Sequence, residues 1–486
     1  MSSGGVRIQG AAGLYANPFI GWSISLEDAA LSGLAEALDG ELMRARLQAR
    51  LRLRLGGGWS VTRCAIVRWR HRPGTRASIQ YRLDVNDGGT RHWHGLMASG
   101  SLFSGGKARR LEKTLQPRTV GPDALLPGRA LAALYEPETR LLWQFFPFDR
   151  ALPNLKAVIA QALPLREQLL APTFGDAVVE LRPVRFRPGI GCTLHARDAA
   201  GRGLYIKVYP PGQAAGAFDR FRTLCRAWSG SIAADGPTAI GPRWCCDALD
   251  ALASPVAEGV VLTDLAPAGP AAPRSAVGRQ QSLAAPAAQV ADALLGLHRS
   301  DLRGLQRRPA DQVVASARQA AERIARVLPD QAQPLRDLLH ALRPLATPGP
   351  VVPTHGDLKP EHVFIRAGQV QLIDLDDAVL AEPLQDLAML VSRLDGIMIE
   401  HADAYAGHGG PARVDGAAQA GLSELRDTLL ARYLERMPDA WSARRLALHR
   451  VSALLLVALH FVQHLKPDWP LLVDRVLRHA WTLLRE

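Results

Sequence analysis

The spacing of hydrophobic positions near the N-terminus predicts two short helices followed by strands. Leucines recur at helical spacing over residues 26–55, and Asp39-Gly40 interrupts the run. Residues of about 61–98 then show strand-like patterning, broken by the hairpin signal Asn86-Asp87-Gly88-Gly89. This half of the chain therefore begins with helices and continues as an antiparallel sheet.

The pattern changes twice more along the chain. A helix near residues 155–170 leads to a second strand-rich stretch over about 177–265. Beyond the Pro/Ala/Gly-rich linker 266–286, the pattern is almost wholly helical apart from one β-like insert at 350–376. We therefore expect a β-rich part followed by a large helical part.

The two strand-rich stretches resemble each other in sequence. Residues 70–83 can be placed over 185–198, so that Arg-x-Arg-Pro-Gly coincides with Arg-x-Arg-Pro-Gly. If the glycines that close the following strands are aligned, Lys207 lies opposite Gly95. Two interpretations remain open: a chance likeness of two hairpins, or a duplicated lobe in which only the second copy kept a chemically useful lysine.

The segment 351–388 carries the clearest chemistry. Its pattern is a strand, the loop His355-Gly356-Asp357, two further strands separated by a glycine turn, and then Asp374. This arrangement predicts that Asp357 and Asp374 lie at neighbouring strand ends and face one cleft. Phosphoryl transfer needs two carboxylates with different tasks, one for the attacking hydroxyl and one for a metal ion that binds the phosphates.

This segment resembles the aminoglycoside phosphotransferase and choline kinase-like family. The motifs that carry the resemblance are, in order, HGDLKPEHVFI, LIDLDD and DLA. The resemblance implies an α+β, bilobal protein-kinase-like fold with a small β-rich lobe and a large helical lobe. An extra N-terminal helical and strand-rich region, 1–170, would precede the small lobe, 171–265, and the helical lobe with its catalytic loop, 266–486.

The resemblance also implies roles for residues of the loop. Asp357 would be the catalytic base, His355 would support the loop, and Lys359 would touch the γ-phosphate. Asp374 would bind the metal, with Asp376 as a nearby secondary carboxylate. Asp386 would brace the catalytic loop.

One position departs from the family pattern. The family has an Asn metal ligand where this chain has His362, and an imidazole suits Mn²⁺ or Zn²⁺ better than Mg²⁺. An active enzyme with an altered metal preference, a slow enzyme and a pseudokinase all remain possible. We favour activity because both Asp357 and Asp374 are present.

The nucleotide site is predicted from the second strand-rich stretch. Lys207 matches the lysine that pairs with the α- and β-phosphates, and the turn with Gly189 and Gly191 would offer backbone N–H groups to phosphate. The usual Glu partner of this lysine is missing, which leaves Asp219 as the nearest candidate. Residues 259–265 resemble the last strand of the lobe and the hinge, so the backbone around Thr263 and Leu265 would pair with adenine. The implied cofactors are ATP and Mg²⁺, with Mn²⁺ possible.

Composition narrows the function further. The 486 residues carry a net charge of +12, but only six of the 58 basic residues are Lys, and the Arg residues are scattered, so we expect no nucleic-acid partner. Five Cys without CxxC spacing indicate neither disulfides nor a zinc site. The longest apolar run, 451–462, is too short to span a bilayer, and the N-terminus does not resemble a signal peptide, so no membrane and a cytoplasmic location are expected.

Together these features predict an ATP-dependent phosphotransferase that acts on a hydroxyl of a small molecule, such as a metabolite, sugar or antibiotic. The alternatives are a pseudokinase or nucleotide-binding scaffold, and a kinase that acts on a peptide or protein. The sequence leaves the acceptor and the oligomeric state open. The acids Asp395, Glu400 and Asp403 lie where the family lines its acceptor pocket, although a solvated helix face is the simpler interpretation.

Overall fold

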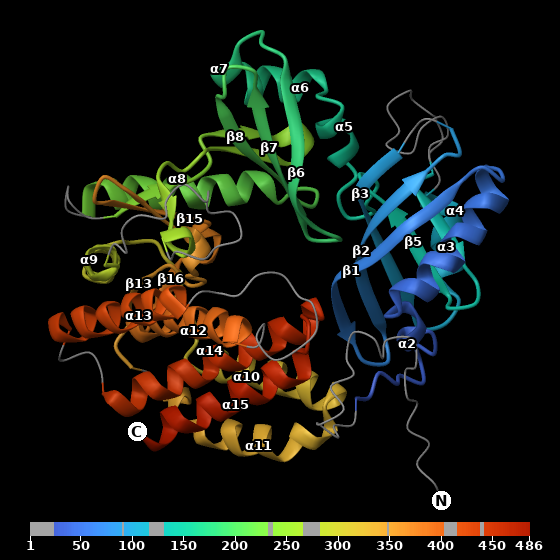
Figure 1. Cartoon of the computed structure of the whole chain (residues 1–486). Coiled ribbons are helices and arrows are strands. Elements are labelled where there is room, and N and C mark those ends of the chain that lie inside the picture. Colours follow the sequence, from blue (N-terminus) through green and yellow to red (C-terminus); the bar gives the residue numbers. More distant parts are fainter. Residues whose placement is uncertain are drawn as a thin grey trace, which may run out of the picture.

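A computed structural model describes residues 24–89, 92–115, 131–231, 237–265, 282–347, 349–402, 416–437 and 442–486. Two five-stranded β-sheets and a large, mainly helical lobe that carries two smaller sheets make up these residues (Figure 1). The predicted bilobal fold with an extra N-terminal region is confirmed, and Asp403 lies outside the described residues.

The first sheet has the antiparallel order β1-β2-β3-β5-β4. It is preceded by the two predicted helices, the second of which is N-capped by the carboxylate of Asp39, a hydrogen-bond acceptor for the N–H of Leu42. The elements are α2 (Leu34–Ala37), α3 (Gly40–Leu55), β1 (Ser60–Arg72), β2 (Arg76–Asn86), β3 (His92–Phe103), α4 (Lys107–Leu115), β4 (Ala133–Glu136) and β5 (Leu141–Phe145).

The second sheet has the order β10-β11-β8-β7-β6, which is the same topology read from its other edge. Three short helices precede it, and a long helix, α8, follows its third strand. The elements are α5 (Leu155–Ile159), α6 (Leu163–Leu165), α7 (Ala171–Phe174), β6 (Val179–Arg187), β7 (Gly191–Asp198), β8 (Gly203–Val208), α8 (Ala214–Ser231), β10 (Trp244–Cys246) and β11 (Ala251–Pro255).

The large lobe is helical and carries small strands beneath the catalytic loop. Its helices are α9 (Ala284–His298), α10 (Asp311–Val327), α11 (Ala332–Ala341), α12 (Pro383–Ala402), α13 (Gly416–Arg436), α14 (Ala443–His464) and α15 (Trp469–Arg485). Its strands are β12 (Val260–Val261), β13 (Val352–Thr354), β14 (Val363–Arg366), β15 (Gln369–Ile373) and β16 (Val379–Ala381), and β9 (Thr238–Ile240) joins β15 in parallel.

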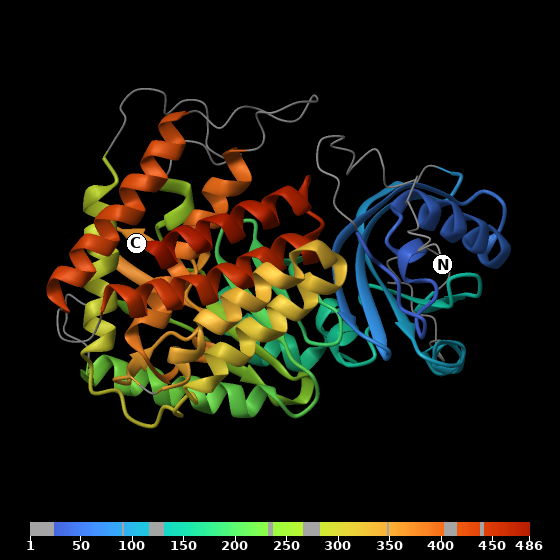
Figure 2. The same ribbon diagram turned by 90° about the horizontal axis from the view of Figure 1, so that it is seen from below.

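The first sheet packs on the helical lobe. One continuous core joins side chains of β1, β2 and β5 to those of α10, α11, α14 and α15. The Trp69 indole N–H of β1 donates to the carbonyl of Val462 on α14 at 2.8 Å. Figure 2 shows this sheet beside the helices. A separate core holds the second sheet together with the helices of 152–174.

The predicted duplication extends to the whole sheet. In both copies a first hairpin is followed by a third strand, a helix and two more strands with the same neighbours. The strand pairing also corrects the alignment. Thr193 pairs with Lys207 as Ser78 pairs with Ser101, so the counterpart of Lys207 is Ser101 and not Gly95. Glycine spacing was misleading because β3 is longer than β8.

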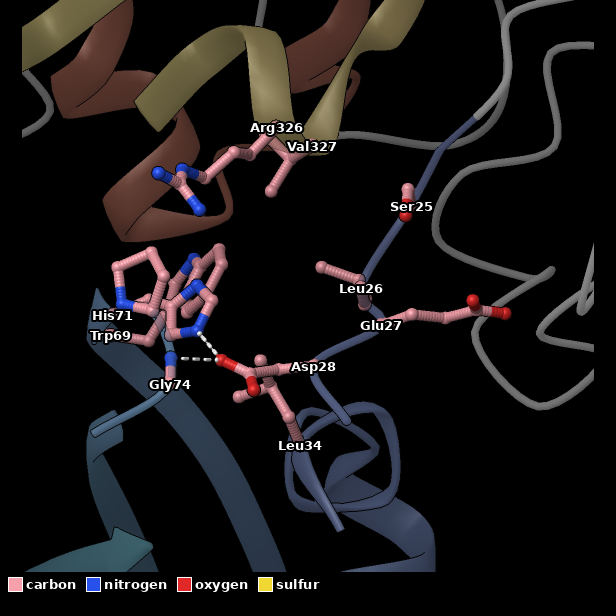
Figure 3. A pocket seen from close by; sticks show the side chains of 11 residues that line it. Ser25, Leu26, Glu27, Asp28, Leu34, Trp69, His71, Gly74, Arg326 and Val327 are labelled. Carbon is pink, nitrogen blue, oxygen red and sulfur yellow. Dashed lines mark hydrogen bonds and ion pairs between the residues drawn. The ribbon is translucent and has the colours of Figure 1, made fainter. Parts of the chain in front are cut away.

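An aspartate marks the start of each copy. Asp28 accepts hydrogen bonds from the N–H groups of Ala30 at 3.0 Å and Gly74 at 2.9 Å. Asp149 accepts from Ala151 and Gly189, both at 2.8 Å. Each carboxylate therefore ties the start of its unit to the turn of its first hairpin. Figure 3 shows the contact of Asp28 with Gly74, together with its contact to His71 at 2.7 Å.

Helix α14 is the one helix within the described ranges that is long and apolar enough to cross a membrane. However, 78% of its most apolar window is buried inside the protein, as in the core helix of a globular lobe. Its length and composition are therefore weak evidence for a membrane span.

Candidate active site

The catalytic loop is fixed from below by Asp386 on α12. This fully buried carboxylate accepts the backbone N–H of His355 at 2.6 Å and of Gly356 at 2.9 Å. His298 lies 3.3 Å away and also contacts the Tyr433 hydroxyl at 2.6 Å. Burial disfavours the charged carboxylate, but these hydrogen bonds outweigh it and lower the pKa of Asp386. Asp386 thus braces the loop, as the resemblance implied, and His298 is buried beside it as a structural group.

Gly356 is required by the shape of the loop. Its φ is +81°, and a Cβ there would lie 2.0 Å from the carbonyl oxygen of Asp377. The His355 ring is buried and its Nε2 lies 2.9 Å from the carbonyl oxygen of Ile373. His355 therefore connects the loop to the end of β15, just before Asp374.

Asp357 and Lys359 lie side by side after this turn. The Lys359 ammonium donates to the Asp357 carboxylate at 2.5 Å. Asp357 keeps about a third of its side chain exposed, at 32%, whereas Lys359 is 11% exposed. An exposed carboxylate held by a buried cation is suited to meet an incoming hydroxyl.

The carboxylates of Asp374 and Asp376 face Lys207 of the small lobe. Asp374 has a left-handed backbone, with φ +59°, and its carboxylate accepts from the Lys207 ammonium of β8 at 3.2 Å. Lys207 also contacts Asp376, and its ammonium lies over the Tyr209 ring. Burial opposes the charge on Lys207, but Asp376 and Asp374 outweigh it and raise its pKa. Burial likewise opposes the charge on Asp374, but Lys207 and His362 lower its pKa to about 2.

His362 lies next to Asp374. Its Nε2 is 3.6 Å from an Asp374 oxygen, and its ring stacks on His355 with centroids 5.5 Å apart. Burial and the His355 charge lower the pKa of His362 to about 4, so the imidazole is neutral at pH 7 and has a lone pair to offer.

The side chains around Asp374 are of the kinds that bind a divalent cation. Within the described residues no three His, Cys, Asp or Glu side chains form a ready-made metal site. A Mg²⁺ ion bound through one or two carboxylates and phosphate oxygens needs no such cage. The two carboxylates Asp374 and Asp376, with the neutral His362 beside them, therefore fit a cation that arrives with a nucleotide.

Three sequence-based expectations for the nucleotide site need correction. The first concerns Asp219, the expected partner of Lys207. Lys207 instead pairs with Asp374 and Asp376 of the other lobe. Asp219 acts electrostatically on Cys245 of β10, which is two strands away from β8 in the sheet.

The second correction concerns the glycine turn. The N–H of Gly189 donates to Asp149 and so is already occupied. The neighbouring Pro188 and Ile190 line a cleft together with residues 68–70 of β1. The turn therefore lies beside the first sheet. Gly191 is the first residue of β7 and pairs with Arg187. The turn is therefore stabilised by the protein itself.

The third correction concerns the hinge. The last strand of the small-lobe sheet is β11, whereas Val260–Val261 pairs with β14 of the large lobe. Thr263 and Leu265 follow in a short 3₁₀ helix that contacts the helix Pro360–His362. The strand-like pattern of 259–265 was real, but pattern alone does not tell which sheet a strand joins.

Several residues near the site were not anticipated. Arg308 donates from its guanidinium to the carbonyl of Gly356 at 3.0 Å. Arg187 of β6 and Arg393 of α12 lie within electrostatic range of Asp357. Burial and the charges of Asp357 and Asp376 raise the pKa of Asp377. Only Asp377 had a signal in the sequence, as the last residue of LIDLDD; the arginines come from distant segments.

A family model described as the phosphotransferase enzyme family matches residues 193–417. This segment contains Lys207, Asp357 and Asp374. No curated protein matches the chain.

Three solved structures illustrate the structural likeness. A choline/ethanolamine kinase family protein from Mesorhizobium loti shares 14% identity, with 68% of this chain and 94% of that chain covered and a TM-score of 0.41. A putative fructosamine-3-kinase from Thermobifida fusca shares 20% identity, with 66% of this chain and 99% of that chain covered and a TM-score of 0.37. A thermostable mutant of the aminoglycoside phosphotransferase APH(4)-Ia, in a ternary complex with ADP and hygromycin B, shares 14% identity. The match covers 65% of this chain and 96% of that chain, with a TM-score of 0.41.

The family match confirms the resemblance predicted from the sequence. It also confirms the predicted enzyme class, a phosphotransferase of the kinase type.

Proposed function

We propose that this chain transfers the γ-phosphoryl group of ATP to a hydroxyl of a small molecule. The observation that carries the proposal is the meeting of Lys207 from the small lobe with Asp374 and Asp376 from the large lobe. Asp357 stands in the same region on a loop that Asp386 holds rigidly. Phosphoryl transfer depends mainly on such positioning and on the balance of charge.

Each group has a task in this reaction. The acceptor oxygen forms a bond to the γ-phosphorus while the bond from that phosphorus to the ADP oxygen breaks, and the hydroxyl proton passes to Asp357. Lys207 and Lys359 offset phosphate charge. Asp374 and Asp376, with His362 beside them, would hold Mg²⁺ or Mn²⁺, which supplies further charge neutralisation when bound.

Replacement of Asp357 by Asn tests the proposal. The change removes a proton acceptor but keeps the shape, so turnover should fall about a hundredfold or more while ATP affinity stays nearly unchanged. Coupled-assay turnover and calorimetric ATP binding measure the two quantities. Unchanged turnover would show that Asp357 is not the base.

A pseudokinase scaffold is the second candidate, and two observations favour it. His362 is buried and neutral where the family has an amide ligand, and Lys207 has no carboxylate partner on α8 among the described residues. The candidates differ in outcome: a scaffold would bind nucleotide without consuming it in the presence of any acceptor.

A further inference from the structure

Acidic side chains near the expected acceptor region are already neutralised within the protein. Asp395, which is 2% exposed, lies 2.9 Å from a nitrogen of Arg426 and 3.0 Å from one of Arg450, with His479 at 3.3 Å. Glu400 pairs with Lys466. The described acids of α12 are therefore committed to internal ion pairs and do not offer free negative charge to a cationic acceptor.

Arginine side chains, in contrast, gather near Asp357 without a direct ion pair in the described part of the chain. Five arginines form what we call the arginine cluster: Arg68 and Arg70 of β1, Arg185 and Arg187 of β6, and Arg393 of α12. None of the five makes an ion pair with a carboxylate of the described ranges. The buried Nε atoms of Arg68, Arg187 and Arg393 also lack a hydrogen-bond partner there.

The five guanidinium groups are close enough to act on one another. Burial, followed by the charges of Arg70, Arg187 and other members, lowers the pKa of Arg68 to about 9. Burial and neighbouring arginines also lower the pKa of Arg70. Gathering like charges and removing them from water is costly unless a counter-charge binds.

The cluster lies beside the catalytic base. Arg187 and Arg393 are both within electrostatic range of Asp357. Arg68, Arg70 and Arg187 line one cleft between the first hairpin of each sheet, together with Ser78 and Gln80. Gln463 of α14 holds the Arg68 guanidinium at 2.9 Å. The extra N-terminal sheet therefore supplies one wall of a cleft whose other wall includes Arg187, an arginine within electrostatic range of the base.

We propose that the acceptor of this enzyme is an anion, carrying a phosphate or carboxylate group that the arginine cluster binds while its hydroxyl faces Asp357. The inference rests on the proposed phosphoryl transfer and names its substrate class. Arginine is the side chain best suited to this task because its planar fork donates two parallel hydrogen bonds to either group. Lys207 is not a member of the cluster: it pairs with Asp374 and Asp376 and serves the nucleotide side.

The first test uses sulfate as a probe and needs no knowledge of the acceptor. Sulfate binding is measured by calorimetry for the wild type, Arg70→Gln, Arg187→Gln and Lys207→Ala. Arg63→Gln is a matched control because Arg63 is an exposed arginine on the same strand as Arg70. Loss of a charged hydrogen-bond donor should weaken sulfate binding roughly tenfold or more in both cluster variants. Arg63→Gln should bind sulfate like the wild type, whereas Lys207→Ala should lose only sulfate at the nucleotide's phosphate site and keep the binding that depends on the cluster.

The second test compares acceptors of one shape and different charge: glucose 6-phosphate, glucuronate, glucose and glucosamine. We expect the anionic sugars to be favoured at least about tenfold in kcat/KM, with this advantage lost in Arg70→Gln and the KM for ATP unchanged. A preference for glucosamine or glucose would overturn the inference. So would a sulfate affinity that is the same in Arg70→Gln and Arg187→Gln as in the wild type. Weaker ATP binding in Arg70→Gln would also overturn it, by assigning the cluster to the nucleotide.

The two tests separate the inference from the proposed function. A chain that neither binds ATP nor phosphorylates any acceptor contradicts phosphoryl transfer, and the sulfate measurement then still decides whether the cluster is an anion site.

Discussion

His362 is the residue at which this site departs most from the family pattern that it resembles, and its contacts indicate what it does. The neutral ring lies 3.6 Å from Asp374, close enough to join the shell of a cation held by that carboxylate. An imidazole favours Mn²⁺ over Mg²⁺, and an amide oxygen reverses the preference. We therefore expect His362→Asn to raise activity with Mg²⁺ relative to Mn²⁺. Titration of both metals against both proteins measures the ratio, and an unchanged ratio would place His362 outside the metal shell.

The residues of this site differ in how far the sequence could predict them. Asp357, Asp374 and Asp386 follow from short local strings whose strands and helix form where they were expected. The partners of Lys207 could not be predicted from the sequence, because the carboxylates of Asp374 and Asp376 lie more than a hundred positions away, in the other lobe. The arginine cluster was likewise missed, because its members come from three separate elements and the sequence shows them only as scattered charges.

At the scale of elements, Glu382 joins the start of α12 to α14 and to the segment before β13. It accepts from Arg445 at 2.7 Å and from the N–H of Gly349 at 3.1 Å, and His449 lies 2.9 Å away. Burial opposes its charge, but His449 and Arg445 outweigh burial and lower the pKa of Glu382 from 4.5 to about 2. A lowered folded-state pKa means that the charged carboxylate stabilises the folded state.

This stabilisation is complete above a pH of about 4.5 and is lost as the pH falls toward 2. We expect Glu382→Gln to lower the free energy of unfolding by about 2–3 kcal/mol at pH 7, and by clearly less near pH 3. Urea unfolding at both pH values measures the difference. Glu322→Gln, at an exposed position of α10, serves as the control and should change little at either pH. A loss of stability that is the same at both pH values would exclude the charge as its cause.

The aspartate at the start of each duplicated unit makes a second prediction at this scale. Asp28 and Asp149 accept hydrogen bonds from equivalent N–H groups, including Gly74 and Gly189. Asp28→Ala and Asp149→Ala should therefore each lower stability by about 1–2 kcal/mol. Urea midpoints measure this, with Glu27→Gln as the exposed neighbour control. A large effect in one unit and none in the other would show that the two networks are not equivalent.

At the scale of the whole molecule, the duplication raises the question of how many nucleotides one chain binds. The first sheet has the topology of the second but has Ser101 in place of Lys207. Ser101 is buried and accepts from Arg76 at 3.3 Å. The sequence contains HGD only once. The first sheet instead shares a core with the helical lobe and contributes Arg68 and Arg70 to the cleft that Arg187 also lines. The first copy therefore has a structural role, and under the proposal above it also helps to bind the acceptor, without a nucleotide site of its own.

We accordingly expect one ATP per chain, bound in the cleft served by Lys207. Lys207→Ala removes the cation that faces Asp374 and Asp376, so most of the ATP affinity should be lost, about tenfold or more. Ser101→Ala, the matched change in the first sheet, should alter neither stoichiometry nor affinity. Calorimetry on the three proteins gives both quantities. Two sites per chain, or full affinity without Lys207, would mean that the first sheet binds nucleotide and that the duplicated units have kept a common function.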